Sequence, residues 1–67
     1  MAKIFLSEYT STTTNISAHV YKWSNGKGYE VNCYRDSLEV RKEVFSTETQ
    51  ADDFADTWVL ENEQTGT

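Results

Sequence analysis

The sequence contains no proline, three glycines and one cysteine among its 67 residues. With Cys33 as its only cysteine, the chain cannot close an internal disulfide. Cys33 and the only histidine, His19, also fall short of the full ligand set of a structural zinc ion. A domain this small therefore depends on good core packing or on a partner chain. A lone thiol is typical of a reducing compartment, so we expect a cytoplasmic protein.

Long apolar runs are missing as well. Only three apolar residues follow Lys3 in succession, which is too short for the hydrophobic region of a secretory signal. No segment approaches the roughly 18–20 apolar residues that a membrane-spanning helix requires. We therefore expect a protein that does not enter a membrane.

Basic residues are scarce compared with acidic ones. Eleven Asp and Glu residues oppose six Lys and Arg residues, which gives a formal charge of −5. Nucleic-acid-binding domains usually carry a basic patch, whereas excess negative charge repels phosphate backbones and anionic membranes. The charge balance favours a protein as the partner and disfavours nucleic acid.

The residues that are present predict strands in the first two-thirds of the chain. Alternating apolar and polar residues indicate a first strand within residues 1–9, a polar loop over residues 10–15 and a three-stranded meander over residues 16–45. In the last of these strands, Leu38, Val40 and Val44 share one face by simple alternation. Phe45 falls out of phase with them, which a bulge or the end of the strand near Val44 would explain.

The dipeptide Asn25-Gly26, placed between two alternating segments, is a strong hairpin signal because both residue types accept positive φ. A turn at this point pairs residues whose numbers add up to about 51. Cys33 then lies opposite residue 18, and His19 points to the other face. This register predicts that Cys33 and His19 do not form a catalytic pair.

The clearest periodic signal predicts a helix over residues 47–61, followed by a polar tail over residues 62–67. Thr47-Glu48-Thr49-Gln50 fits a capping box. Apolar residues then recur at helical spacing on one face, namely Ala51, Phe54, Ala55, Trp58 and Val59. Carboxylates crowd the first half of the helix, where the helix dipole favours them: Glu48, Asp52, Asp53 and Asp56. This acidic helix surface is either a solvated face or a contact surface for a basic partner.

Together these segments predict one α+β domain over residues 1–67. It consists of a three- to four-stranded antiparallel meander with one C-terminal helix packed on one face. The helix is expected to lay Phe54 and Trp58 across the sheet, and the first strand is expected to join a sheet edge.

The sheet face opposite the helix is the best candidate for a binding site. The predicted partner-binding residues on this face are Tyr21, Trp23, Tyr34 and Arg41, with Phe5 beside them. Aromatic platforms of this kind stack nucleic-acid bases or anchor protein partners. Two alternatives remain open at this point: residues 1–15 cover the face, or a second copy of the chain pairs with it.

Catalytic chemistry has little support in the sequence. A general base needs an orienting partner and a substrate pocket, and the sequence reveals neither for His19, which is expected to be a half-exposed strand residue. Cys33 is expected to be a buried structural cysteine. The helix carboxylates lack the spacing and the glycine of a calcium-binding EF-hand. We therefore expect no enzyme activity, no cofactor and no metal.

Residues 26–60 resemble a known pattern of three strands and a helix. The resemblance is carried by Gly26–Asp36 and Val44–Ala55, with a shared signature at Phe45, Thr47 and Ala51. The families are the arm-binding amino-terminal domains of tyrosine-recombinase integrases and the plant ethylene-response-factor domains. They place a sheet in the major groove of duplex DNA. The resemblance therefore implies a DNA-binding sheet whose strands here offer the basic residues Lys22, Arg35, Arg41 and Lys42.

The composition is similar to that of small proteins of marine tailed phages, which are short, rich in threonine and asparagine, and free of proline. The leading hypothesis is a small non-enzymatic protein-interaction module, phage-encoded and acting in the host cytoplasm, which binds through the open sheet face or the acidic helix. The alternative is a nucleic-acid-binding domain of the integrase-arm type that uses the same sheet face.

Overall fold

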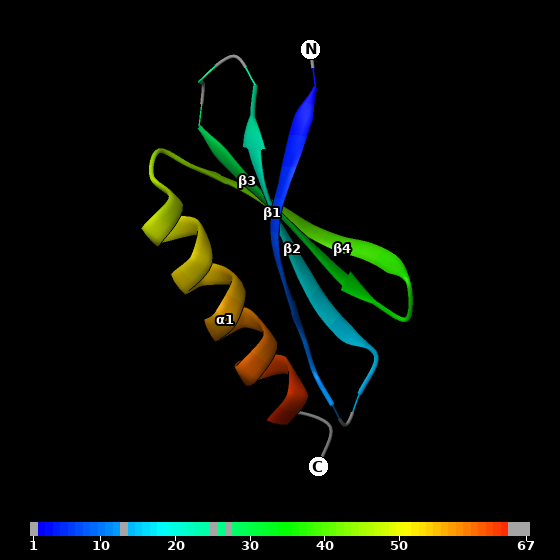
Figure 1. The fold of residues 1–67 in the computed structure, drawn as a ribbon. Helices are drawn as coiled ribbons and strands as arrows, with labels where there is room; N and C mark the ends of the chain where they lie inside the picture. The colour runs from blue at the N-terminus through cyan, green and yellow to red at the C-terminus, as the bar shows by residue number, and fades with distance from the viewer. Residues whose placement is uncertain (1, 13, 25, 27, 65–67) are drawn as a thin grey trace.

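The computed structural model describes residues 2–12, 14–24, 26 and 28–64, with side chains as far as Asn62. The chain forms four strands and one helix in the order β1 (Lys3–Thr10), β2 (Ile16–Trp23), β3 (Tyr29–Arg35), β4 (Leu38–Phe45) and α1 (Glu48–Gln64). The strands make one antiparallel sheet in chain order, and α1 crosses one face of it (Figure 1). The predicted α+β meander with a C-terminal helix is confirmed. No helix in the described part of the chain is long and apolar enough to cross a membrane.

The first strand lies at one edge of the sheet, as predicted. It pairs antiparallel with β2, and its register shifts between Phe5 and Ser7. Phe5 pairs with Tyr21 on one side of this shift, whereas Glu8 pairs with His19 on the other side. The extra residue is Leu6, which packs against the core. Because of the shift, Phe5 and Glu8 lie on the same face of the sheet.

The β2–β3 hairpin has the register that its turn sequence predicts. Ala18 pairs with Cys33, so the paired numbers add up to 51. Gly26 adopts a φ of 75°, which is the left-handed conformation that favours glycine, while Asn25 lies outside the described residues. Cys33 points toward α1, and His19 points to the other face.

The last strand contains a bulge that the sequence did not locate. Cys33 pairs with Arg41, but the next residue, Tyr34, pairs with Glu39, which leaves Val40 as the additional residue. The bulge therefore lies at Val40 rather than near the end of the strand. It reverses the alternation of every side chain that follows it.

Two predictions about β4 are wrong because of this bulge. Leu38 and Val44 lie on opposite faces of the sheet, with exposed fractions of 70% and 59%. Arg41 points toward the helix, where its guanidinium carbon lies 5.0 Å from the ring centroid of Phe54. Phe45 shares that side, with its ring centroid 5.3 Å from the same ring, and is therefore in phase with the core.

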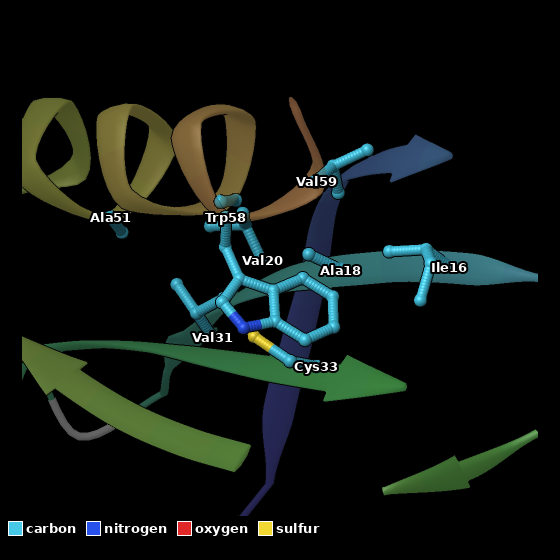
Figure 2. Packing of buried hydrophobic residues seen from close by; sticks show 9 residues of the cluster. Ile16, Ala18, Val20, Val31, Cys33, Ala51, Trp58 and Val59 are labelled. Atoms are coloured by element: carbon cyan, nitrogen blue, oxygen red, sulfur yellow. The ribbon is translucent and has the colours of Figure 1, made fainter. Parts of the chain in front are cut away.

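The core lies between α1 and the two central strands. Trp58 inserts its indole ring between the helix and the sheet, and Val31 and Cys33 lie beside it (Figure 2). Phe54 packs at the margin and is partly buried. The buried apolar residues of this core are Ile16, Ala18, Val20, Val31, Cys33, Ala51, Ala55, Trp58 and Val59.

The helix begins as its capping sequence predicts and ends later than predicted. The backbone N–H of Gln50 donates to Thr47 Oγ1 at 3.2 Å, which is an N-cap hydrogen bond. The helix continues to Gln64, so the predicted tail is wrong for residues 62–64, while residues 65–67 lie outside the described residues. Asn62 helps to explain the extension, because its amide donates to Trp58 O at 2.8 Å and its Oδ1 accepts from Arg35 at 2.7 Å.

Candidate functional site

The sheet face that points away from α1, called the outer face below, carries most of the predicted site. The helix packs on the opposite face, and β1 lies beside β2 in the plane of the sheet rather than across the outer face (Figure 1). Residues 3–10 therefore extend the outer face instead of covering it. Alternation and register place Phe5, His19, Tyr21, Trp23 and Tyr34 on this face.

Four rings on the outer face form an aromatic cluster, defined as Phe5, His19, Tyr21 and Tyr34. The ring centroids of Phe5 and Tyr21 lie 5.7 Å apart at an angle of 70°, and those of His19 and Tyr34 lie 4.9 Å apart. The Phe5–Tyr21 contact is edge-to-face, which is a favourable arrangement of aromatic pairs, and the His19–Tyr34 contact is tilted. Phe5 remains 54% exposed, and the other three rings are half-buried. The cluster thus joins β1, β2 and β3 and still offers apolar surface to solvent.

A second group on the outer face, called the Glu30 network, consists of Lys3, Trp23, Glu30 and Asn32. Glu30 and Asn32 are 3% and 1% exposed, although neither faces the helix. Lys3 Nζ lies 2.9 Å from Glu30 Oε2 and donates to Asn32 Oδ1 at 3.2 Å. Trp23 Nε1 donates to Glu30 Oε1 at 3.2 Å, and Asn32 Nδ2 donates to Glu30 Oε2 at 2.8 Å. Both carboxylate oxygens of the buried Glu30 are therefore satisfied.

The electrostatics of the Glu30 network favour its charged form. Burial tends to raise the pKa of Glu30, but hydrogen bonds from Lys3 and Asn32 and the charges of Lys3 and Lys42 outweigh it and lower the pKa below 4.5. The hydrogen bond to Glu30 is the main cause that raises the pKa of Lys3 above 10.5, against the opposing effect of burial. The network therefore holds a carboxylate and an ammonium ion together at neutral pH.

The outer face also has a hollow at the end near the β1–β2 turn. Its volume is about 630 Å³, and its lining includes Glu8, His19, Tyr21 and Tyr34 together with hydroxyl groups such as that of Ser37. Glu8 Oε2 lies 3.2 Å from His19 Nε2 and supplies an orienting carboxylate for the imidazole. The sequence did not predict Glu8 as a partner of His19. Before the bulge in β1 the paired numbers add up to 26, so only the bulge brings Glu8 opposite His19.

Three of the four predicted sheet-face residues lie where they were expected. Tyr21 and Tyr34 belong to the aromatic cluster, and Trp23 belongs to the Glu30 network. Arg41 is wrong as an outer-face residue, because the bulge at Val40 turns its side chain toward Phe54 on the helix side.

The predicted acidic helix surface is present in part. Glu48, Asp53 and Asp56 are exposed. Asp52 is half-buried and accepts a hydrogen bond from Ser7 Oγ at 3.3 Å. Burial and the nearby charge of Asp52 raise the pKa of Tyr9 on β1. Asp52 therefore also joins the helix to β1.

The chemistry of the cysteine and of metal ligands gives no further site in the described part of the chain. Cys33 is buried on the helix side, and burial raises the pKa of its thiol to about 11. The thiol is therefore protonated at neutral pH, and the sheet separates it from His19. No group of three or more His, Cys, Asp or Glu among the described residues is placed to hold a metal ion.

No protein-family model matches the chain, and neither the curated proteins nor the solved structures contain a significant match to it. The resemblance of residues 26–60 to DNA-binding sheet domains therefore stays a prediction.

Proposed function

We propose that the protein is a small non-enzymatic interaction module that binds a partner protein through the outer face of its sheet. The observation that supports this most is the aromatic cluster, which stays half-exposed on a face that the helix leaves open. Exposed aromatic groups with polar surroundings mark binding surfaces, and aromatic residues supply much of the binding energy at protein interfaces. Phe5, 54% exposed at the edge of the cluster, is the expected anchor.

The charges of the outer face support a protein partner rather than nucleic acid. Among the described strand residues, this face carries Lys3 and Lys42 against three carboxylates, Glu8, Glu30 and Glu39. Lys3 is already paired with Glu30. Nucleic-acid affinity comes largely from neutralising several phosphates, which this set of charges does not favour. A nucleic-acid-binding domain that stacks bases on the aromatic cluster is the alternative.

The setting of the module is part of the proposal. The free thiol of Cys33 suits a reducing cytoplasm. The composition, with its many threonines and its lack of proline, is the support for a phage-encoded protein that acts on a host or phage partner.

The test is capture from a lysate of the source cells on the immobilised protein, with and without nuclease. The wild type is compared with Phe5→Ser, which removes the expected anchor, and with Leu60→Ser, which removes a 47% exposed apolar residue on α1. We expect a protein band that survives nuclease, is lost with Phe5→Ser and is kept with Leu60→Ser. Bands that disappear with nuclease would favour the nucleic-acid alternative. Equal capture by both variants would contradict binding through the outer face.

A further inference from the structure

The Glu30 network is built like a binding site for a cation. The ammonium group of Lys3 lies 2.9 Å from a carboxylate oxygen of Glu30 and 3.2 Å from the amide oxygen of Asn32. It also lies 4.5 Å from the ring centroid of Tyr21 and 5.9 Å from that of Trp23. A carboxylate, an amide oxygen and two aromatic rings around one ammonium ion combine an ion pair with cation–π attraction.

The walls of this site do not depend on the lysine that occupies it. Tyr21, Trp23, Glu30 and Asn32 all belong to the central hairpin of β2 and β3. The hydrogen bonds from Trp23 and Asn32 hold the Glu30 carboxylate in place without any contribution from Lys3. The occupant comes from elsewhere, because Lys3 is the first residue of the edge strand β1.

The ammonium group can leave without detaching β1. The backbone N–H of Ser24 donates to Ala2 O at 3.0 Å, and this bond holds the start of β1 against the end of β2. The Lys3 side chain is 32% exposed and has a flexible stem of several rotatable bonds. Rotation of that stem is enough to move the ammonium group into solvent and to open the site.

We propose that Tyr21, Trp23, Glu30 and Asn32 form a cage that recognises a lysine side chain of the partner protein, and that Lys3 occupies this cage in the unbound protein. The inference rests on the proposed function, since the cage lies on the outer face, and it assigns a basic residue to the partner. The buried carboxylate is paired with an ammonium ion both in the unbound protein and in the complex, so neither state leaves an isolated buried charge. Lys3 thus acts as an internal competitor that sets the affinity for the partner.

The chemistry of the cage selects primary ammonium ions. A lysine ammonium group has three N–H donors, and the cage offers oxygen acceptors from Glu30 and Asn32 beside the Tyr21 ring. A quaternary ammonium ion makes the cation–π contact with the aromatic rings, but it has no N–H group to donate to the oxygens of Glu30 and Asn32. We therefore expect binding of n-butylammonium, which mimics a lysine side chain, to be several-fold tighter than binding of tetramethylammonium.

The experiment empties the cage with Lys3→Ala and titrates the full-length protein with n-butylammonium. The indole N–H of Trp23, which donates to Glu30, reports on the cage in nitrogen–proton correlation spectra, while the indole N–H of the core residue Trp58 serves as an internal control. Lys22→Ala is the matched variant, because Lys22 is exposed and pairs with Ile4 on the other face. We expect a saturable shift of the Trp23 signal in Lys3→Ala, and a response at least tenfold weaker in the wild type and in Lys22→Ala. Equal responses in all three proteins would overturn the proposal.

A second measurement covers the case in which Lys3→Ala folds poorly. A cation that binds only the folded cage must stabilise that variant in proportion to its occupancy. We expect n-butylammonium to raise the urea midpoint of Lys3→Ala more than tetramethylammonium at equal ionic strength, and to leave Lys22→Ala unchanged. If n-butylammonium did not raise the urea midpoint of Lys3→Ala in this selective way, the proposed cage would be wrong. Rescue without capture of any partner protein would instead contradict the proposed function and leave the cation site intact.

Discussion

Glu30 is a charged side chain buried on a sheet face that the helix leaves open. Its side chain is 4% exposed, and it depends on Lys3 for its counter-ion and on Trp23 and Asn32 for the rest of its hydrogen bonds. A buried ion pair adds little to stability compared with apolar packing, but the loss of one partner leaves an uncompensated charge. The outer face is therefore sensitive to single substitutions in this network and tolerant of paired ones.

A double-mutant cycle tests this dependence. Lys3→Met is expected to lower the free energy of unfolding by about 1–3 kcal/mol, less than for a fully buried pair because the Lys3 side chain is 32% exposed. The double variant Lys3→Met/Glu30→Gln, which has no buried charge, should lose clearly less than the sum of the two single variants. Urea denaturation gives the free energy of unfolding of the wild type, the two single variants and the double variant. Lys22 is exposed, so the free energy of unfolding of the control variant Lys22→Met should stay within roughly 0.5 kcal/mol of the wild-type value. Strict additivity would show that the two side chains do not interact.

The same pair predicts how stability depends on pH. The folded pKa of Glu30 is lowered, so its contribution is present above the usual value of 4.5 and is lost as the pH falls through the folded pKa. The folded pKa of Lys3 is raised, so its contribution is present below the usual value of 10.5 and is lost as the pH rises through the folded pKa. We therefore expect this pair to make a constant contribution to the urea midpoint of the wild type between a pH of about 4.5 and a pH of about 10.5. Lys3→Met should show a smaller alkaline loss than the wild type, because only the loss caused by other groups with raised pKa values, such as Cys33 and Tyr9, remains. An alkaline profile equal to that of the wild type would refute the assignment to Lys3.

At the scale of elements, the β2–β3 hairpin is the part of the molecule that local chemistry specifies most strongly. Gly28 has a φ of 121°, and a Cβ atom there would lie 2.7 Å from the carbonyl oxygen of Phe45 at the end of β4. Glycine at this position therefore allows the start of β3 to approach the end of β4 closely. Gly26 has a φ of 75°, but a Cβ atom there would meet no described heavy atom within 4 Å.

The two glycines predict unequal costs for the same substitution. Gly28→Ala combines an unfavourable φ with a backbone clash and is expected to lower the free energy of unfolding by about 2–3 kcal/mol. Gly26→Ala has only the conformational cost of roughly 1 kcal/mol. Thermal or urea unfolding of both variants measures the difference. Equal losses would mean that the approach of Phe45 to Gly28 does not constrain the sheet.

The bulges explain which parts of the fold could be predicted from sequence. The register of the β2–β3 hairpin follows from its turn residues, and the helix follows from its capping box and apolar period, because both signals are local. The bulges at Leu6 and Val40 lie in the two edge strands, and no local sequence motif marks them. The errors at the site follow from these bulges: Arg41 was assigned to the wrong face, and Glu8 was not recognised beside His19.

The Glu30 network could not be predicted for a related reason. Lys3 and Glu30 are separated by 27 positions in the sequence, and their contact requires β1 to pair with β2 in the register that brings Lys3 opposite Trp23. The sequence predicted that the first strand joins an edge but not which register it takes. The same limit applies to the extension of α1, which involves Arg35 and Asn62 from distant segments.

At the scale of the whole molecule, charge is divided between the sheet and the helix. All six basic residues precede Ser46 and are balanced there by five carboxylates, whereas six carboxylates and no basic residue follow it. The helix segment is therefore strongly negative, and the strand segment is close to neutral. Under the proposed function, we expect such an asymmetry to attract a basic partner at long range and the aromatic contacts of the outer face to hold it at short range.

This division predicts separate effects on the rates of association and dissociation. With the captured partner, higher salt should slow association, since long-range attraction is screened within about 8–10 Å at physiological ionic strength. Phe5→Ser should instead speed dissociation, because it removes a short-range contact. Surface plasmon resonance separates the two rates. If Phe5→Ser changed only the association rate, this result would contradict the role of Phe5 as an anchor.

The most direct test of the central claim is chemical-shift mapping of the captured partner on isotope-labelled protein. Binding through the outer face predicts shifts that concentrate on β1, β2 and β3 around Phe5, Tyr21 and Tyr34, with the exposed positions of α1 little changed. Shifts confined to the acidic residues of α1, such as Glu48, Asp53 and Asp56, with an unperturbed aromatic cluster, would contradict it.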